Sequence, residues 1–131
     1  MKLSRNPDDY NYLALSNCAR VESINDPSDW NHVQKALSIL GFSNEDKQSM
    51  WRIIAAILVL GNVQFEQNPN QKDSHKVSIK NRDVVDTVGD LLGVPGMMLA
   101  RVLTSRSIVT GVGKKQSQIH IPLDLVEVIK P

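Results

Sequence analysis

Residues 43–61 read SNEDKQSMWRIIAAILVLG, and this stretch decides the fold class. Asp46 stands three residues after Ser43 in a near capping box, and its acidic neighbours suit the positive end of a helix. Between residues 50 and 60 nearly every side chain is apolar, which is typical of a helix buried on most sides. We therefore predict a helix from Ser43 to about Leu60 that forms the centre of the core.

A first helix is expected just before this stretch, over residues 29–40. The glycine at position 41 is well placed to follow its C-cap, and residues 25–28 read as a turn that leads into it. Its apolar face has the helical spacing of Val33, Ala36, Leu37 and Leu40. In the segment before that turn, three side chains are expected to anchor on the core: Tyr10, Tyr12 and Leu13.

Two further helices are expected in the second half of the chain. Asn81 is suited to cap a helix over residues 82–92, which Gly93 then ends. The apolar side chains of that helix are Val84, Val85, Val88, Leu91 and Leu92. A short helix over residues 95–103 follows, and the side chains that it offers for packing are Met97, Met98, Leu99 and Val102.

Short alternating stretches predict two pairs of strands. Residues 63–66 and 77–79 form one possible pair, and residues 106–109 and 118–121 form another around a loop at 110–117. The predicted fold class is mainly α with a small antiparallel β component (α+β). We expect a single domain over residues 1–131, a compact helical subdomain with a basic loop resembling a β-hairpin.

The composition excludes several functional classes. A net charge of +1 and a pI near 7.9 argue against a dedicated nucleic-acid binder. No P-loop motif occurs in the sequence, and the three histidines lack the spacing of metal ligands. The longest apolar run, residues 53–60, is much shorter than a membrane span. We expect no catalytic residue, cofactor or metal in this chain, no membrane contact, and a cytoplasmic location.

One local feature stands out from this ordinary composition. No acid occurs between Arg101 and His120, whereas Arg106, Lys114 and Lys115 all lie in that interval. A basic loop could contact an acidic partner through salt-sensitive interactions. Ser117, which follows two lysines, is also a plausible kinase target. The alternative is a solvated turn that carries lysines by chance.

Residues 36–43 read ALSILGFS and contain a Gly-Phe-Ser turn, and residues 53–65 read IIAAILVLGNVQF, a helix ending in Leu-Gly-Asn. In these two stretches the sequence resembles the myosin heavy-chain motor domain, and the resemblance extends over nearly the whole chain. The stretches at 10–13, 83–93 and 103–108 also fit the family pattern in order and spacing. The resemblance implies the upper 50-kDa subdomain of a class I-like motor.

The resemblance implies two loops of an actin-binding surface. Loop 4 maps onto residues 67–76, and the cardiomyopathy loop maps onto residues 108–121. The residues expected to contact actin are Arg106, Lys114, Lys115, Ser117, His120, Lys72 and Lys76. Many class I myosins carry a phosphorylatable residue in the second loop, so Ser117 is the expected phosphorylation site. The aromatic residue common two positions after it is here Ile119.

Other departures from the family pattern suggest an excised domain, which is either engineered or, as the alternative, a natural truncated product. Val59 stands where the family usually has histidine, Gly96 where a longer side chain is common, and residues 126–131 do not continue the family sequence. The parent motor is an actin-activated ATPase that uses ATP and Mg, whereas this chain lacks the P-loop and switch motifs. Its expected partners are filamentous actin, bound weakly, and the remainder of the motor, in the actin cytoskeleton. The alternatives are a stabilised subdomain without activity, studied for its fold, and a scaffold for a protein partner.

Overall fold

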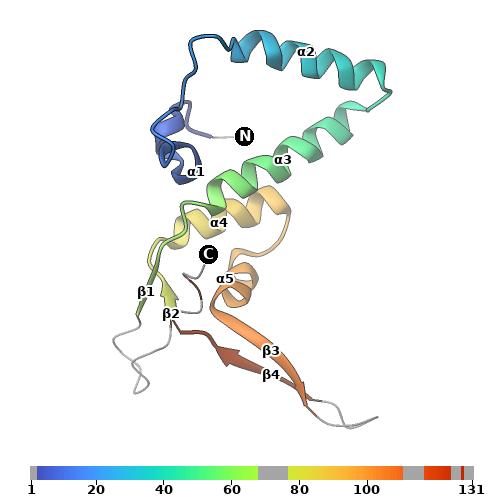
Figure 1. Ribbon diagram of the computed structural model, residues 1–131. Coiled ribbons are helices and arrows are strands. Elements are labelled where there is room, and N and C mark those ends of the chain that lie inside the picture. The colour runs from blue at the N-terminus through green and yellow to red at the C-terminus, as the bar shows by residue number, and fades with distance from the viewer. Residues whose placement is uncertain (1–2, 68–76, 111–116, 125–127, 129–131) are drawn as a thin grey trace. The chain divides into compact units, whose positions relative to one another are not determined.

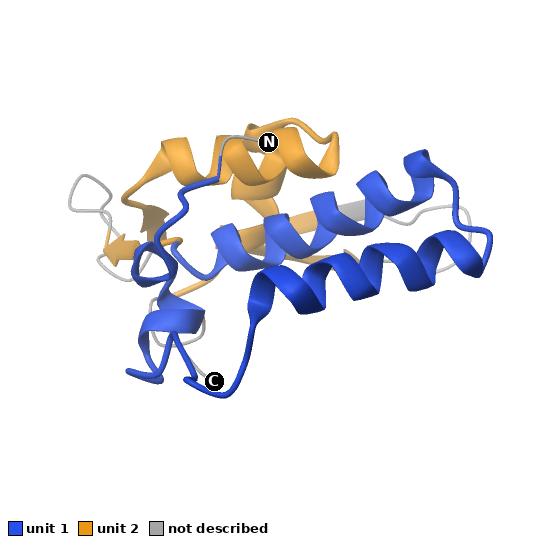
Figure 2. Ribbon diagram, turned by 90° about the horizontal axis from the view of Figure 1, so that it is seen from above, with its two compact units in different colours: residues 1–62 blue, residues 63–131 orange. Residues whose placement is uncertain are grey.

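The computed structural model describes residues 3–67, 77–110, 117–124 and 128 (Figure 1). The chain falls into two compact units. Unit 1 comprises residues 1–62 and unit 2 residues 63–131, coloured separately in Figure 2. Helices dominate the described residues, and two antiparallel two-stranded sheets accompany them. The predicted class, mainly α with a small antiparallel β component, is confirmed. The single domain over residues 1–131 stays a prediction.

Unit 1 begins with two short helical turns that are tied to a residue far along the chain. These turns are the 3₁₀ helix η1 (Pro7–Asp9) and the helix α1 (Asn11–Ala14). The Asn62 side chain accepts a hydrogen bond from the Asn11 backbone N–H at 2.8 Å and donates one to the Asp9 carbonyl at 2.6 Å. One side chain therefore fixes the backbone of both turns.

The predicted anchoring of this segment is correct for only one of its three residues. Tyr10 is buried, whereas Tyr12 and Leu13 are exposed. The ring of Tyr12 nevertheless lies against the backbone of Gly61, where an added Cβ would come within 2.6 Å of it. A helix of a single turn directs only part of its surface inward, so adjacent apolar residues cannot all be buried.

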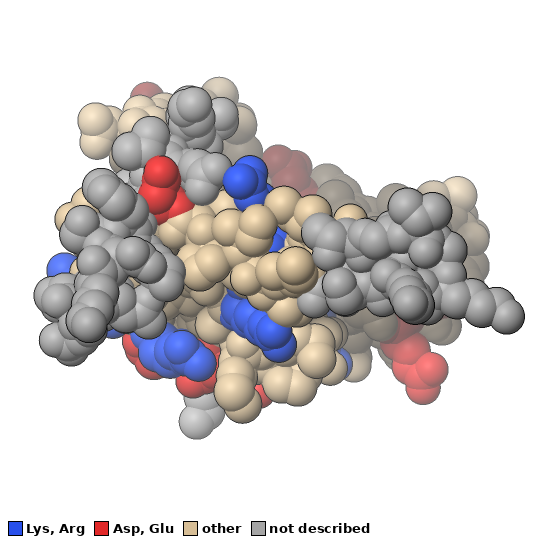
Figure 3. All heavy atoms as spheres, turned by 90° about the horizontal axis from the view of Figure 1, so that it is seen from below, with Lys and Arg blue, Asp and Glu red and all other residues tan. Residues whose placement is uncertain are grey.

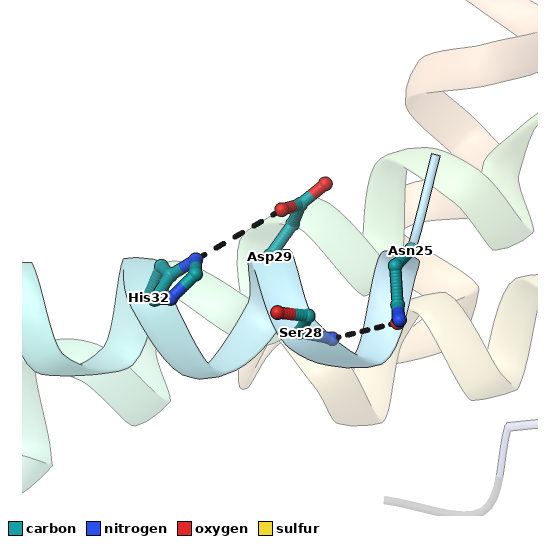
Figure 4. A network of polar contacts seen from close by, with 4 residues as sticks. All are labelled: Asn25, Ser28, Asp29 and His32. Atoms are coloured by element: carbon teal, nitrogen blue, oxygen red, sulfur yellow. Dashed lines mark hydrogen bonds and ion pairs between the residues drawn. The ribbon is translucent and has the colours of Figure 1, made fainter. Parts of the chain in front are cut away.

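Helix α2 (Asp26–Ile39) begins three residues earlier than expected. The side chain of Asn25 caps it by accepting a hydrogen bond from the Ser28 backbone N–H at 3.1 Å (Figure 4). A proline is well tolerated in the first helical turn, so residues 26–28 of the predicted turn belong to the helix and Asn25 is its cap. The end of the helix is as expected, because Gly41 adopts a φ of +85°, which favours glycine.

Helix α3 (Asn44–Leu60) has the capping box that its sequence predicts. The Asp46 backbone N–H donates to the Ser43 hydroxyl at 3.1 Å, and the Asp46 carboxylate accepts from the Ser43 backbone N–H at 3.0 Å. The hydrogen bonds from the Ser43 side chain and from its backbone lower the pKa of Asp46 below its ordinary value of 3.8. The ionised carboxylate is therefore the form that favours the folded helix.

The Asp46→Asn variant is expected to be less stable than the parent chain at neutral pH, and the difference should shrink in acid. Because folding lowers the pKa of Asp46, its contribution is complete above the unfolded value of 3.8 and is lost as the pH falls through the folded value. Thermal melting of both chains by circular dichroism between pH 7 and pH 2.5 measures this difference. A difference that stays constant over the whole range would contradict the role given to the ionised carboxylate.

The prediction that α3 is buried on most sides is wrong for the described residues. Ala55, Ala56 and Val59 are buried. Ile53, Ile54 and Ile57 each remain more than half exposed. An apolar sequence all round a helix allows burial on any side, but the described chain covers only one face of this helix.

Unit 2 opens with the short antiparallel pair β1 (Phe65–Gln67) and β2 (Val77–Ile79), as the alternating sequence predicts. Asn81 precedes α4 (Arg82–Leu92), but it does not cap this helix through its side chain. Its amide oxygen instead accepts a hydrogen bond from the Gln64 backbone N–H at 2.8 Å. The side chain therefore fixes the start of α4 beside the residue that leads into β1.

The helices α4 and α5 (Gly96–Thr104) pack closely because small residues lie between them. Gly89 lies so near the connecting segment that an added Cβ would come within 2.6 Å of the Val94 carbonyl oxygen. Val85 and Val88 are the fully buried side chains of this unit among the described residues. Three of the side chains that α5 was expected to pack are exposed, because the helix buries Ala100 instead: Met97, Met98 and Val102.

Candidate functional site

A hairpin of two six-residue strands carries the described residues of the predicted site. Strand β3 (Ser105–Thr110) pairs antiparallel with β4 (Ser117–Pro122), which confirms the predicted hairpin. Backbone hydrogen bonds hold its base: the Leu123 N–H donates to the Thr104 carbonyl at 2.9 Å, and the Val77 N–H donates to the Leu123 carbonyl at 3.2 Å. The hairpin is thereby tied to the end of α5 and to β2.

The predicted site residues divide between described and undescribed parts of the chain. Arg106 lies on β3 opposite Ile121, and His120 lies on β4 opposite Ser107. Ser117 is the first residue of β4, and its backbone pairs with Thr110. The predicted lysines lie outside the described residues: Lys72, Lys76, Lys114 and Lys115.

The described part of the hairpin is accessible on its surface. Arg106, Ser107 and His120 are exposed, as are the apolar residues Val109 and Ile119. Figure 3 draws the molecule from below; the described Lys and Arg atoms in the middle of that face lie among uncharged residues, whereas others near its left edge adjoin Asp and Glu atoms. The described strands of the hairpin are therefore accessible to a partner. In the sequence, the interval from Arg106 to His120 contains basic residues and no acid.

His120 does not stand alone on the hairpin, because it forms a cross-strand pair with Ser107. The Ser107 hydroxyl and the His120 Nδ1 atom are 2.9 Å apart. Either atom can be the donor, depending on which ring nitrogen of the histidine carries the proton. The pair fixes the orientation of the imidazole relative to β3.

A surface hollow of about 380 Å³ lies between α5 and the base of the hairpin. We call it the α5–hairpin hollow. Its lining is basic, hydroxylated and partly apolar, and it consists of Met98, Arg101, Val102, Ser105, Arg106, Ser107 and His120. The structure thus brings together two residues predicted as site residues, Arg106 and His120, with others that were not.

Arg101 and Ser107 are not among the site residues that the sequence predicts. Arg101 belongs to the acid-free interval, but its place in the last turn of α5, facing the same hollow as the hairpin, requires the tertiary structure. Ser107 was missed because a strand residue acquires its partner only from the register. The signal in the sequence is the pairing of the two predicted strands: once Ser105 is placed opposite Pro122, Ser107 lies opposite His120.

Other polar groups in unit 1 have local explanations. The imidazole of His32 lies 4.0 Å from the Asp29 carboxylate one turn away on α2, as Figure 4 shows, and both side chains are largely exposed. No group of three metal-binding side chains occurs among the described residues. In the same part of the chain, no helix combines the length and the apolar character needed to cross a bilayer.

Unit 1 also holds an aromatic contact between its two long helices. The rings of Trp30 on α2 and Trp51 on α3 have centroids 4.5 Å apart at an angle of 51°. The Lys47 ammonium adds a hydrogen bond to the Ser38 hydroxyl at 3.1 Å. The indole N–H of Trp51 is buried without a hydrogen-bond partner among the described residues. The ring contact and the Lys47–Ser38 hydrogen bond hold the two helices together, in addition to the turn at Gly41 that joins them.

Comparison with known proteins gives a consistent result over the chain. The family model described as "Myosin head (motor domain)" matches residues 1–129. "Myosin IF heavy chain" of Dictyostelium discoideum is 34% identical over 122 residues, which are 93% of this chain and 11% of that protein. "Unconventional myosin-Ic" of Rattus norvegicus is 37% identical over 123 residues, 94% of this chain and 11% of that protein. The chain therefore spans about a ninth of the length of these relatives.

Proposed function

Because this chain belongs to the myosin head (motor domain) family, with class I myosins among its relatives, we propose that it is part of an actin-based motor. Within that motor it contributes loops to the surface that contacts filamentous actin. Its place is the actin cytoskeleton of the cytoplasm. The region corresponds to the upper 50-kDa subdomain, and its remaining partner is the rest of the motor.

The observation that carries this proposal is the exposed, acid-free hairpin. Strands β3 and β4 are joined by residues 111–116, which include Lys114 and Lys115, and no acid occurs between Arg101 and His120. A positive loop attracts an acidic partner and helps to fix how the two surfaces align, and added salt screens that attraction. In this proposal, following the resemblance, the hairpin corresponds to the cardiomyopathy loop, and residues 67–76 correspond to loop 4 with Lys72 and Lys76.

Phosphorylation of Ser117 is the proposed regulation of this surface. Ser117 begins β4, directly after the connecting residues that hold the two lysines. A phosphate adds about −1.5 to −2 charges. In a full motor, the Ser117→Glu and Ser117→Ala variants are therefore expected to differ in their actin-activated ATPase rate. Equal rates in the two variants would contradict this regulation.

The chain is not proposed to hydrolyse ATP by itself. The 131 residues hold no P-loop motif to cradle the phosphates of a nucleotide, so its residues do not fit ATP and Mg. In the parent motor those ligands would belong to other segments. The proposed contribution of this chain is binding, without a catalytic residue of its own.

A second candidate function is a stable subdomain without activity of its own. Exposed apolar side chains instead favour the other alternative, a scaffold for a protein partner: Ile53, Ile54 and Ile57 on α3, and Met97, Met98 and Val102 on α5. Apolar surface of this kind marks protein contacts, and the remainder of the motor would cover it. A folded chain that ignores actin would support this second function.

Co-sedimentation with filamentous actin at low and moderate salt tests the proposed function. The Lys114→Ala/Lys115→Ala variant is expected to bind about fivefold more weakly or worse than the parent chain, since it loses two charges at the contact. The matched control is Arg20→Ala/Lys35→Ala, which removes the same charge from exposed positions of unit 1. Binding that weakens equally in both variants, or that is absent in a folded chain, would contradict the assignment of the hairpin.

A further inference from the structure

Three segments of unit 2 meet at the backbone of Leu123. Its N–H donates to the Thr104 carbonyl at the root of the hairpin at 2.9 Å, and its carbonyl accepts from the Val77 N–H of β2 at 3.2 Å. We propose that Leu123 is an anchor that fixes the orientation of the hairpin relative to the β1–β2 pair, so that the two parts move as one unit. The anchor consists of backbone groups and depends on no charged side chain.

The bond between Leu123 and Thr104 fastens the hairpin to the end of α5. Ser105 pairs with Pro122, so Thr104 and Leu123 continue the register of the ladder by one position. Because bonded and non-bonded pairs alternate in an antiparallel ladder, Pro122 falls in a non-bonded pair, where its missing N–H costs no bond. The Thr104 hydroxyl in turn donates to the Ala100 carbonyl at 2.9 Å. The helix end and the returning strand are thereby bonded at the same residue.

The bond between Val77 and Leu123 leaves the β1–β2 ladder intact. The Lys80 N–H donates to the Gln64 carbonyl at 2.9 Å, and bonded pairs alternate along the ladder, so the Val77 N–H points away from β1. It bonds instead to Leu123, on the other edge of β2. Val77 is buried, and a buried N–H without a partner would cost free energy. The fold therefore gains from keeping Leu123 in place.

The junction between α5 and the hairpin makes the coupling direct. Helix α5 ends at Thr104 and β3 begins at Ser105, so no connecting residue separates the helix from the strand. A rotation of the hairpin about this junction has to move Leu123 as well. The carbonyl of Leu123 would then move away from β2, and the bond to Val77 resists that movement.

This inference deepens the proposed function and rests on it for its consequence. The hairpin and the segment between β1 and β2 are the two parts of the proposed actin-binding surface. The anchor would present both parts to a filament in one fixed arrangement. Its test uses the free chain without filaments, so the anchor can fail while actin binding stands, and the reverse also holds.

The test measures residual dipolar couplings of backbone N–H groups by NMR, in the isotopically labelled 131-residue chain. Val77→Pro removes the N–H that bonds to Leu123, at the first position of a strand, where proline is tolerated. The matched control Val77→Ala shortens the same buried side chain and keeps that N–H. The couplings of α4, α5, β1 and β2 define the reference alignment, against which those of β3 and β4 are compared.

We expect the hairpin to fit the reference alignment in the parent chain and in Val77→Ala. In Val77→Pro its couplings should shrink by roughly a third or more, which is about the loss of order that separates flexible from rigid backbone. Because the couplings report on folded molecules, a general loss of stability would not produce this difference.

Two results would overturn the anchor. A folded Val77→Pro chain whose hairpin still fits the reference alignment would show that the bond to Leu123 does not hold the hairpin. Equal losses in Val77→Pro and Val77→Ala would assign the effect to side-chain packing. If circular dichroism shows that Val77→Pro does not fold, Leu123→Pro replaces it with Leu123→Ala as its control, and the same two results decide.

Discussion

The Val85→Ala/Val88→Ala variant is expected to lose about 4 kcal/mol in free energy of unfolding, roughly 2 kcal/mol for each truncated valine. Both side chains belong to α4, and they are 0% and 1% exposed. Their removal takes away buried methyl groups and leaves a cavity that the neighbouring backbone can only partly fill. Urea denaturation of the full chain, followed by circular dichroism, measures the loss.

The matched control for this prediction is Val102→Ala on α5. That valine is 66% exposed, so the same truncation should change the free energy of unfolding by less than about 0.5 kcal/mol. Equal losses for the exposed and the buried valines would show that α4 does not hold the core of unit 2.

Gly89→Ala is expected to lower the free energy of unfolding by about 2 kcal/mol, although alanine favours helices more than glycine. The added Cβ would lie 2.6 Å from the Val94 carbonyl oxygen and 3.0 Å from the Gly96 nitrogen. Both atoms belong to the backbone, so no rotation of a side chain relieves the contact. The segment joining α4 to α5 would have to move.

Gly93→Ala separates this steric effect from conformational strain. Gly93 ends the same helix with a φ of +73°, and no described atom outside its immediate neighbours lies within 4 Å of the position that an added Cβ would take. Its replacement should cost about 1 kcal/mol from the left-handed backbone alone. Thermal melting of the two variants compares them directly. A larger loss in Gly93→Ala would mean that α4 and α5 do not approach as closely as described.

Local chemistry explains which features could be predicted before the structure. The Ser43–Asp46 capping box and the left-handed glycines at 41 and 93 use atoms only a few residues apart. The same holds for the hairpin, because alternating residues on both sides of a short connection specify two strands. The early start of α2 was missed although its signal is local, since Asn25 with Pro27 was interpreted as a turn.

Features that depend on contacts between distant residues could not be predicted in this way. Asn81 has the right identity for a cap, but its side chain bonds to Gln64, seventeen positions earlier. The apolar residues of α3 gave no information on which face would be buried, because a uniform pattern has no preferred side. The candidate site also combines both kinds of feature: its hairpin follows from local sequence, whereas the residues that lie near its side chains depend on contacts between distant positions.

By itself, the sequence determined the existence of helices α2 to α5, the Ser43–Asp46 capping box, the basic hairpin and the resemblance to the myosin motor. Each of these depends on residue types at short or regular spacing, which a single chain displays directly. Only the tertiary structure decided that Ser107 faces His120 and that Arg101 shares their hollow. Register and helix packing set those distances, and they result from backbone hydrogen bonds and close contacts that no linear spacing specifies.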